Sequence, residues 1–413
     1  MIRILPSKFE GRLSAPASKG NAERILLMAA MSTYPSCVKN VPDCDDIDTV
    51  LQCLLDLGCK ISITTDGSVY VDPFPRNNPV PTASLDFRDS LTCCKITTAL
   101  AATQGFKASC TGSLELQRNR LLPLTSRMAI RGVKFSNFSL PFEMEGRLEG
   151  GDYLLDSQDG EQNISALLMS LPLCLENSTI KVEGEIPDPS FIDTTIKALN
   201  DFGIIVEKIK DGFAIPGKQI YKTPGEITVE SDWPLSCMWL MAGAASGETE
   251  EGVTITGLTN RNPIGYQDLQ PLLSLISQNF KSLNFNAKHC PDMACVLAAM
   301  AIVKGSSVEI SGVTSLKNKE TNRLKALADV AMQMGQKATI TDDSLIIEGI
   351  GEPNYEEDVL IDCHDDPWVF MSMAVASSVA KKPYCLKDEG GADKTYRTFF
   401  QDYLRLGGHY QII

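Results

Sequence analysis

A structural unit that recurs about every 70 residues constrains the fold of this chain more than any other feature. In five places an apolar segment with helical periodicity ends near a glycine, the residue that most readily closes a helix in the left-handed conformation. Short runs of β-forming residues follow four of these helices, at 59–63, 133–135, 204–206 and 337–340. The helical segments span 51–58, 124–132, 194–203, 326–335 and 399–407.

The one long gap between these glycines, from 203 to 335, holds a further helical segment at 269–280 and a strand-like run at 283–285. Several units continue through a turn into a second strand, which is the pattern of a β-hairpin. The turns are Asp66-Gly67, Asp211-Gly212 and residues 342–344. Six similar α/β units therefore account for the whole chain.

Composition excludes several classes of function. The chain has 413 residues, a length typical of two or three domains, and no apolar run of membrane-spanning length. Its net charge of −14 disfavours nucleic acids and anionic membranes as partners. The N-terminus lacks a secretory signal, and the thirteen cysteines show neither CxxC nor zinc-site spacing. We therefore expect a cytoplasmic protein with reduced cysteines, no metal and no membrane contact.

A loop and helix near the start favour an anionic ligand. Pro16 and Gly20 interrupt regular structure, and an apolar helical run follows at 25–30. Lys19 and Arg24 then fall at the mouth of the helix, where free backbone N–H groups and the helix dipole attract anions. The alternative is an ordinary surface helix with two solvated basic residues.

The late segment 317–324, Lys-Asn-Lys-Glu-Thr-Asn-Arg-Leu, is the most specific motif. Together with the six units and the Lys19 loop, it resembles the enolpyruvyl transferase family, most closely its 5-enolpyruvylshikimate-3-phosphate synthase branch. That family reads Arg-x-Lys-Glu-Thr-Asp-Arg here, so Lys317 and Asn322 are departures. Further matches, in the family's order along the chain, are Asp45-Asp46, Arg118-Asn119-Arg120, Gln162, Pro291-Asp292-Met293-Ala294 and Lys394-Thr395.

The resemblance implies a reaction without metal or organic cofactor. The enolpyruvyl group of phosphoenolpyruvate moves to the 5-hydroxyl of shikimate 3-phosphate, and phosphate leaves. Asp292 would orient or deprotonate that hydroxyl, Glu320 would handle the proton at C3, and Lys19 would lie between the substrates. By the same resemblance, phosphoenolpyruvate would be held by Arg120, Arg323 and Lys394, and shikimate 3-phosphate by Lys19, Arg24, Gln162 and Lys319.

Several positions depart from the family's pattern. Each change removes a hydroxyl or phosphate contact, or adds a carboxylate where the family binds phosphate. Glu161 replaces a serine before Gln162, and Trp368 aligns with an arginine that grips phosphoenolpyruvate. The other departures are Gly20, Asp89, Leu91, Lys95, Gly160, Asp188 and Phe191.

The fold implied by the family is a two-domain inside-out α/β barrel of six βαβαββ-type repeats. Residues 1–16 with 230–413 would form one domain (repeats 4–6) and residues 17–229 the other (repeats 1–3). We expect a monomer whose substrates bind between the two halves.

Three functions remain open. The first is an active synthase of the shikimate pathway in aromatic amino acid biosynthesis. The second is a related transferase acting on UDP-N-acetylglucosamine, which uses a catalytic cysteine; here Cys93 and Cys110 are the nearby thiols, in a different motif. The third is a catalytically weak or non-catalytic ligand-binding relative, favoured by the changes at 89–91 and 368. A phosphate-release assay separates the first from the third.

Overall fold

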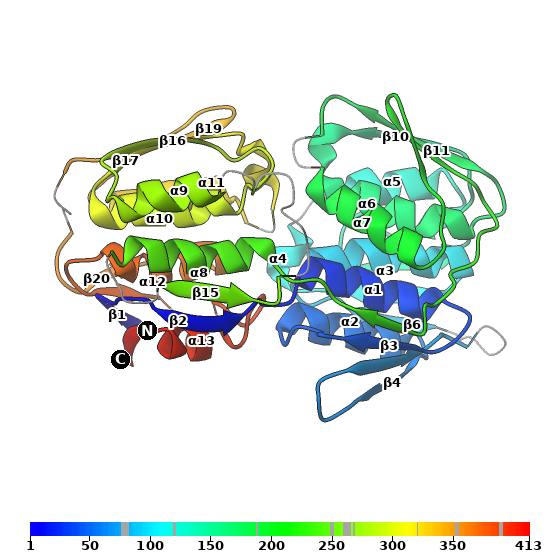
Figure 1. The fold of residues 1–413 in the computed structure, drawn as a ribbon. Coiled ribbons are helices and arrows are strands. Elements are labelled where there is room, and N and C mark those ends of the chain that lie inside the picture. The colour runs from blue at the N-terminus through cyan, green and yellow to red at the C-terminus, as the bar shows by residue number, and fades with distance from the viewer. Residues whose placement is uncertain are drawn as a thin grey trace. The chain divides into compact units, whose positions relative to one another are not determined.

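The computed structural model describes residues 1–75, 82–118, 121–186, 189–247, 252–258, 266, 269–319, 321–351, 355–387 and 391–413. Two compact units divide the chain (Figure 1). Unit 1 consists of Met1–Pro16 and Ser231–Ile413, and unit 2 consists of Ala17–Glu230.

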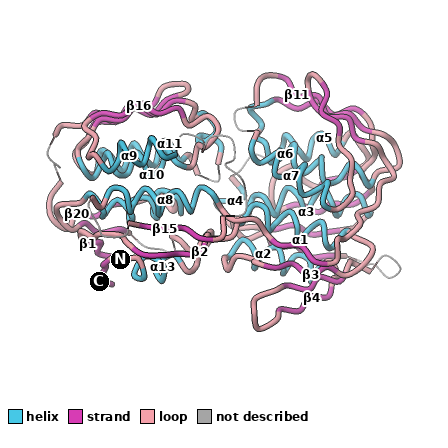
Figure 2. The backbone as a smooth tube through the Cα atoms, in the orientation of Figure 1, coloured by secondary structure: helices cyan, strands magenta, loops and turns pink. Residues whose placement is uncertain are grey.

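Unit 2 contains three four-stranded sheets, and its helices lie on the inner side of these sheets (Figure 2). In two of the sheets the first two strands are parallel, and the third and fourth form an antiparallel hairpin against the second. One repeat comprises β6 (Ala83–Asp86), α3 (Leu91–Gln104), β7 (Ala108–Thr111), α4 (Leu114–Gln117), α5 (Leu122–Ala129), β8 (Val133–Phe135) and β9 (Phe142–Gly146). The next comprises β10 (Asp152–Asp156), α6 (Glu161–Ser170), β11 (Ser178–Glu183), α7 (Ser190–Asp201), β12 (Glu207–Ile209) and β13 (Gly212–Ile215).

The third sheet of unit 2 takes its first strand from the far end of the unit. β14 (Glu226–Thr228) pairs in parallel with β3 (Ser36–Lys39), which lies about 190 residues earlier in the chain. The remaining elements of this repeat are α1 (Lys19–Met31), α2 (Asp45–Asp56), β4 (Lys60–Ile63) and β5 (Val69–Asp72).

Unit 1 repeats the same plan with one reduced sheet. Its complete repeat has β16 (Ser282–Asn286), α10 (Met293–Lys304), β17 (Ser307–Ser311), α11 (Arg323–Gln333), β18 (Lys337–Ile340) and β19 (Ser344–Glu348). The C-terminal repeat has β20 (Val359–Ile361), α12 (Pro367–Val375), β21 (Tyr384–Leu386), α13 (Phe399–Arg405) and β22 (His409–Ile412), and the N-terminal strand β1 (Ile2–Leu5) completes its sheet. The reduced repeat has α8 (Trp233–Ala245), α9 (Leu269–Ser277) and a parallel pair of β2 (Gly11–Ser14) and β15 (Val253–Thr256).

The chain crosses from one unit to the other twice, once after β2 and once after β14, and these two strands have matching roles. Each forms the outer parallel strand of a sheet in its own unit. In the other repeats such a strand leads into a helix of the same unit. Here the chain passes from β2 to α1 and from β14 to α8, which belong to the other unit. This exchange explains why one unit is built from two separate segments.

Composition decides which helices are interior. α10 is apolar on all sides, from Met293 to Val303, and each of these residues is buried. α2 and α7 are instead amphipathic and bury only one face. None of the helices in the described ranges is both long and apolar enough to cross a membrane.

The predicted helix ends and most predicted hairpins are confirmed. All five glycines at the predicted helix ends, 58, 132, 203, 335 and 407, have positive φ. The predicted strand at 204–206 is wrong, because β12 begins only at Glu207. Ile204 N–H bonds back to Leu199 O and closes α7, while the Gln219 side-chain amide satisfies both backbone groups of Ile205. A side chain thus takes the place of a neighbouring strand.

Candidate functional site

Lys19 begins helix α1 in unit 2 and contacts an acid from the next helix. Its Nζ lies 2.5 Å from Oδ2 of Asp46, which is in the first turn of α2. The Lys19 side chain is 20% exposed and that of Asp46 is 5% exposed. The predicted acidic neighbour therefore holds Lys19 by an ion pair at the edge of the core.

Arg24 lies one turn further along α1 and is 1% exposed. Its Nε donates to Thr195 Oγ1 at 2.6 Å, its Nη1 to Gly20 O at 2.7 Å and its Nη2 to Ser165 Oγ at 3.4 Å. All three acceptors are neutral, and no described carboxylate forms an ion pair with this guanidinium. A buried positive charge with only neutral contacts is costly, and an anionic ligand would offset that cost.

Burial also shows in the proton affinity of Arg24. Desolvation lowers the pKa of its guanidinium, and the carboxylates of Glu23 and Glu161 partly offset this effect. The Phe191 ring covers one side of the group, with its centroid 5.8 Å from the guanidinium carbon. We call Lys19, Arg24, Asp46, Ser165 and Thr195 the Arg24 cluster.

A second cluster lies in unit 1, where three helices begin. Arg323, the first residue of α11, donates through Nη1 to Asp292 Oδ1 at 2.7 Å and through Nε to Asp366 Oδ2 at 3.0 Å. Asp292 precedes α10, and Asp366 caps α12 by accepting from Trp368 N and Val369 N.

Thr321 adds a hydroxyl to this group by donating to Asp366 Oδ2. Helix N-termini stabilise negative charge, which suits two carboxylates around one arginine. We call Asp292, Thr321, Arg323 and Asp366 the Arg323 cluster. Its one arginine contacts both of its carboxylates.

The other predicted site residues belong to neither cluster. Gln162, in the first turn of α6, donates to Thr92 Oγ1 on α3 at 3.1 Å. Lys319 follows the short 3-10 helix Thr314–Asn318 and is half-buried, as is Lys394 in the turns before α13. Two predicted residues, Arg120 and Glu320, lie outside the described residues.

The sequence prediction missed three partners. Ser165 and Thr195 hold Arg24, and Asp366 holds Arg323, yet none was assigned to the site. Ser165 follows the predicted Gln162 by less than one helical turn, which was a usable signal. Thr195 is 171 residues from Arg24, and no local pattern marks such a contact.

Comparison with known proteins decides the family. Residues 5–403 match the family model described as EPSP synthase (3-phosphoshikimate 1-carboxyvinyltransferase). The chain belongs to this family.

Full-length relatives of the EPSP synthase family resemble the chain throughout. A 3-phosphoshikimate 1-carboxyvinyltransferase of Clostridium beijerinckii is 27% identical, with 98% of this chain and 97% of that protein covered. An EPSP synthase structure from Acinetobacter baumannii has a TM-score of 0.77 at 19% identity, covering 99% of both chains. The enolpyruvyl transferase NikO from Streptomyces tendae has a TM-score of 0.73 at 15% identity, covering 99% of this chain and 98% of that one. These structures confirm the predicted fold.

The sequence resemblance to the EPSP synthase family aligns Trp368 with an arginine of the family's pattern. The centroid of the Trp368 ring lies 5.9 Å from the guanidinium carbon of Arg323, and the side chain is buried. The tryptophan thus packs against the Arg323 cluster and cannot supply the positive charge of the missing arginine.

The cysteine-dependent alternative finds no support in this EPSP synthase relative. Cys93 and Cys110 are fully buried, and burial raises the pKa of the Cys110 thiol. A buried thiol with a raised pKa is a poor nucleophile. No group of three or more His, Cys, Asp or Glu side chains suited to a metal is found in the described ranges.

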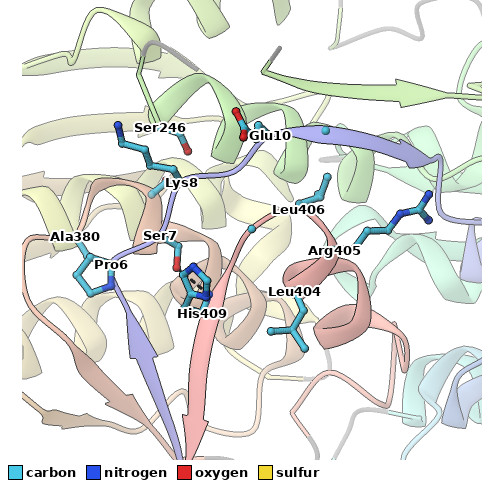
Figure 3. Close-up of a pocket in the computed structure, with 13 residues that line it drawn as sticks. Pro6, Ser7, Lys8, Glu10, Ser246, Ala380, Leu404, Arg405, Leu406 and His409 are labelled. Carbon is cyan, nitrogen blue, oxygen red and sulfur yellow. Dashed lines mark hydrogen bonds between the residues drawn. The ribbon is translucent and has the colours of Figure 1, made fainter. Parts of the chain in front are cut away.

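A cavity of about 1010 Å³ lies in unit 1 (Figure 3), and none of the residues that line it belongs to either cluster. Residues of the β1–β2 connection, the C-terminal end of α13 and β22 line it, and no predicted site residue is among them. Lys8 and Arg405 point in different directions in Figure 3.

Proposed function

We propose that the chain transfers the enolpyruvyl group of phosphoenolpyruvate to the 5-hydroxyl of shikimate 3-phosphate and releases phosphate. This is a cytoplasmic step of aromatic amino acid biosynthesis in the shikimate pathway. Family membership supports the reaction type. The observation that supports the choice of acceptor is the Arg24 guanidinium, which is buried, pairs with no described carboxylate and lies on the same helix as Lys19.

The reaction needs one new C–O bond and one broken C–O bond. The acceptor hydroxyl loses its proton as its oxygen attacks C2 of phosphoenolpyruvate, and C3 gains a proton. The tetrahedral adduct then loses the C3 proton and expels phosphate. Asp292 suits the first role, because it is a carboxylate that is 11% exposed and Arg323 holds its position through a 2.7 Å bond.

The remaining roles follow from the family resemblance. Glu320 is proposed for proton transfer at C3, and Arg120, Arg323 and Lys394 for phosphoenolpyruvate. Gln162 and Lys319 are proposed to join Lys19 and Arg24 in holding the acceptor. Cationic groups stabilise the charge that develops as phosphate departs.

The test is phosphate release from phosphoenolpyruvate in the presence and absence of shikimate 3-phosphate, with the enolpyruvyl product identified by mass spectrometry. We expect acceptor-dependent phosphate release that the Asp292→Asn variant lowers by about 10²–10⁴-fold. Asp329→Asn, a change at a surface acid of α11, serves as the matched control. Product formation unchanged in Asp292→Asn would remove that residue from the mechanism.

A second candidate is enolpyruvyl transfer to a different hydroxyl compound. Departures from the family's pattern near the Arg24 cluster favour it, because Gly20 and Phe191 lack the hydroxyls of that pattern and Glu161 adds a carboxylate. Turnover with phosphoenolpyruvate and other cyclic alcohols, but not with shikimate 3-phosphate, would support this candidate over the first.

A further inference from the structure

Arg88, in the turn between β6 and α3, has a left-handed backbone with a φ of 47°. A side chain with a Cβ atom is strained in this conformation, and the non-glycine residues found there are mostly Asn, Asp or His. Within the described ranges, Arg88 and Lys218 are the non-glycine residues of other types with positive φ. The turn therefore keeps an arginine at a position that other residue types fit better.

Neighbouring segments hold the backbone of Arg88 in this conformation. Its N–H donates to Asp86 Oδ1 at 3.1 Å, and its carbonyl accepts from Ser113 N at 2.8 Å. A Cβ atom on Gly112 would lie 3.1 Å from the same carbonyl, so the two segments are in close contact. Strained residues persist where the surrounding structure fixes them in this way.

The guanidinium of Arg88 takes no part in holding the turn. Arg88 is exposed, and none of the residues that the structure describes forms a hydrogen bond or an ion pair with its side chain. The nearby acids have other partners, because Asp86 accepts from the backbone of Arg88 and Asp89 accepts from Ser113 Oγ. A cation on a fixed turn loses less freedom when it binds an anion than one on a mobile loop.

The strand order places Arg88 at the carboxyl end of two parallel strands. Asp86, the last residue of β6, pairs in register with Thr111, the last residue of β7. Arg88 follows β6 by two residues, so it lies at the edge of the sheet where both strands end. Ligands of α/β proteins commonly bind beyond this edge.

The segment after Arg88 contacts the helices of the Arg24 cluster. Ser90 Oγ donates to Glu23 Oε1 on α1 at 3.3 Å, and Thr92 Oγ1 accepts from Gln162 Nε2 on α6 at 3.1 Å. These contacts lie within four residues of Arg88. The turn thus joins the part of unit 2 to which substrate binding is proposed.

We propose that Arg88 is a further substrate-binding residue, which contacts a phosphate group of one of the two substrates. This inference rests on the proposed enolpyruvyl transfer, in which both phosphoenolpyruvate and shikimate 3-phosphate carry such a group. A guanidinium matches phosphate oxygens in geometry as well as in charge. In a chain with a net charge of −14, a phosphate group needs local cations to bind.

The decisive variant is Arg88→Gly, because glycine accepts the left-handed backbone and lacks the guanidinium. We expect KM for one substrate to rise about tenfold or more, with little change in kcat. The substrate whose KM rises is the one whose phosphate Arg88 binds. Arg88→Lys keeps the charge and should recover most of the affinity. Wild-type KM values for both substrates in Arg88→Gly overturn the inference.

Lys218→Gly is the matched control. Lys218 lies in the same unit, is exposed and has a φ of 58°, so its replacement removes the same charge and the same type of backbone strain. It follows β13, which runs antiparallel to β11, and therefore lies at the opposite edge of its sheet from the carboxyl end of β11. We expect both KM values to stay at the wild-type level. A rise equal to that of Arg88→Gly would reduce the effect to net charge and overturn the inference.

Stability separates a binding role of Arg88 from a structural one. Because glycine relieves the backbone strain, we expect Arg88→Gly and Lys218→Gly to keep or raise the thermal unfolding midpoint of the protein, measured by scanning calorimetry. A raised KM together with a lowered midpoint in Arg88→Gly would assign the arginine a structural role and overturn the inference.

Calorimetric titration distinguishes failure of this inference from failure of the proposed function. Absence of turnover in wild type would contradict the proposed enolpyruvyl transfer. Titration with phosphoenolpyruvate and with shikimate 3-phosphate then decides the role of Arg88. Weaker binding of either compound by Arg88→Gly than by wild type supports phosphate binding by Arg88. Equal affinity, or binding of neither compound by wild type, overturns it.

Discussion

The two units each bury one arginine beside the start of helices, but they balance its charge differently. In unit 1, Arg323 contacts the carboxylates of Asp292 and Asp366. In unit 2, the direct partners of Arg24 are two hydroxyls and a backbone carbonyl. The same residue type, almost equally buried, therefore has carboxylates in direct contact in one unit and only neutral groups in direct contact in the other.

This difference assigns the two arginines different tasks. A guanidinium paired with two carboxylates holds them in place, so it offers a ligand less net charge than a guanidinium with neutral partners. A guanidinium with neutral partners keeps its charge for an anion. We expect Arg323 to act on stability and on the orientation of Asp292 in addition to its proposed contact with phosphoenolpyruvate, and Arg24 to act mainly on acceptor binding.

The largest expected effect is on the stability of unit 1. Arg323→Gln leaves two buried carboxylates without their cation, so we expect a loss of about 3–5 kcal/mol in its unfolding free energy. All three tryptophans, Trp233, Trp239 and Trp368, belong to unit 1. Tryptophan fluorescence during denaturation therefore monitors this unit selectively, and a midpoint equal to that of wild type would contradict the expected role.

Arg24→Gln is the counterpart in unit 2. Because the replaced charge has no carboxylate in contact, we expect little loss of stability but about a tenfold to hundredfold loss of acceptor affinity. Calorimetry with the acceptor measures the affinity, and hydrogen exchange of α1, α6 and α7 measures local stability. An Arg24→Gln variant that binds the acceptor normally but unfolds easily would show that Arg24 stabilises unit 2 and does not bind the acceptor.

Thr321→Val probes a single hydroxyl of the Arg323 cluster. The change removes the hydrogen bond to Asp366, while Arg323 and the helix cap still hold that carboxylate. We expect a loss of about 1–2 kcal/mol in unit 1, again measured by tryptophan fluorescence. Thr195→Val is the matching change at Arg24, and its effect should appear in acceptor binding instead.

The smallest expected effect concerns pH. α10 and α3 end alike, at Lys304-Gly305 and Gln104-Gly105, with both glycines in the left-handed conformation. Burial lowers the pKa of Lys304 to about 8, whereas its ordinary value is 10.5. Between these values the unfolded chain binds more protons than the folded one, so this lysine makes unit 1 more stable as pH rises from 8 to 10.5.

Lys304→Gln gives α10 the same Gln-Gly end as α3. The variant should lack the rise in the stability of unit 1 that Lys304 causes between pH 8 and 10.5. The measurement is the difference in tryptophan-monitored unfolding between wild type and variant across this pH range. A difference that stays constant with pH would show that Lys304 keeps its ordinary pKa in the folded protein.

Local sequence predicted the repeating elements well. Periodic apolar segments closed by glycine located α2, α7 and α11, and the turn residues located the hairpins β4–β5 and β18–β19. These features depend on contacts within a few residues, which the sequence states directly. The error at 204–206 arose where Gln219, fourteen residues away, satisfied the backbone of Ile205.

The sequence by itself determined the α/β repeats, the anion-favouring start of α1 and the identity of Arg24, Asp292 and Arg323 as candidates. Only the tertiary structure decided which partners each arginine has. Thr195 and Ser165 reach Arg24 across 171 and 141 residues, and Asp366 reaches Arg323 across 43. Whether a buried charge meets a carboxylate or a hydroxyl depends on how helices distant in sequence pack together, and no local pattern contains that information.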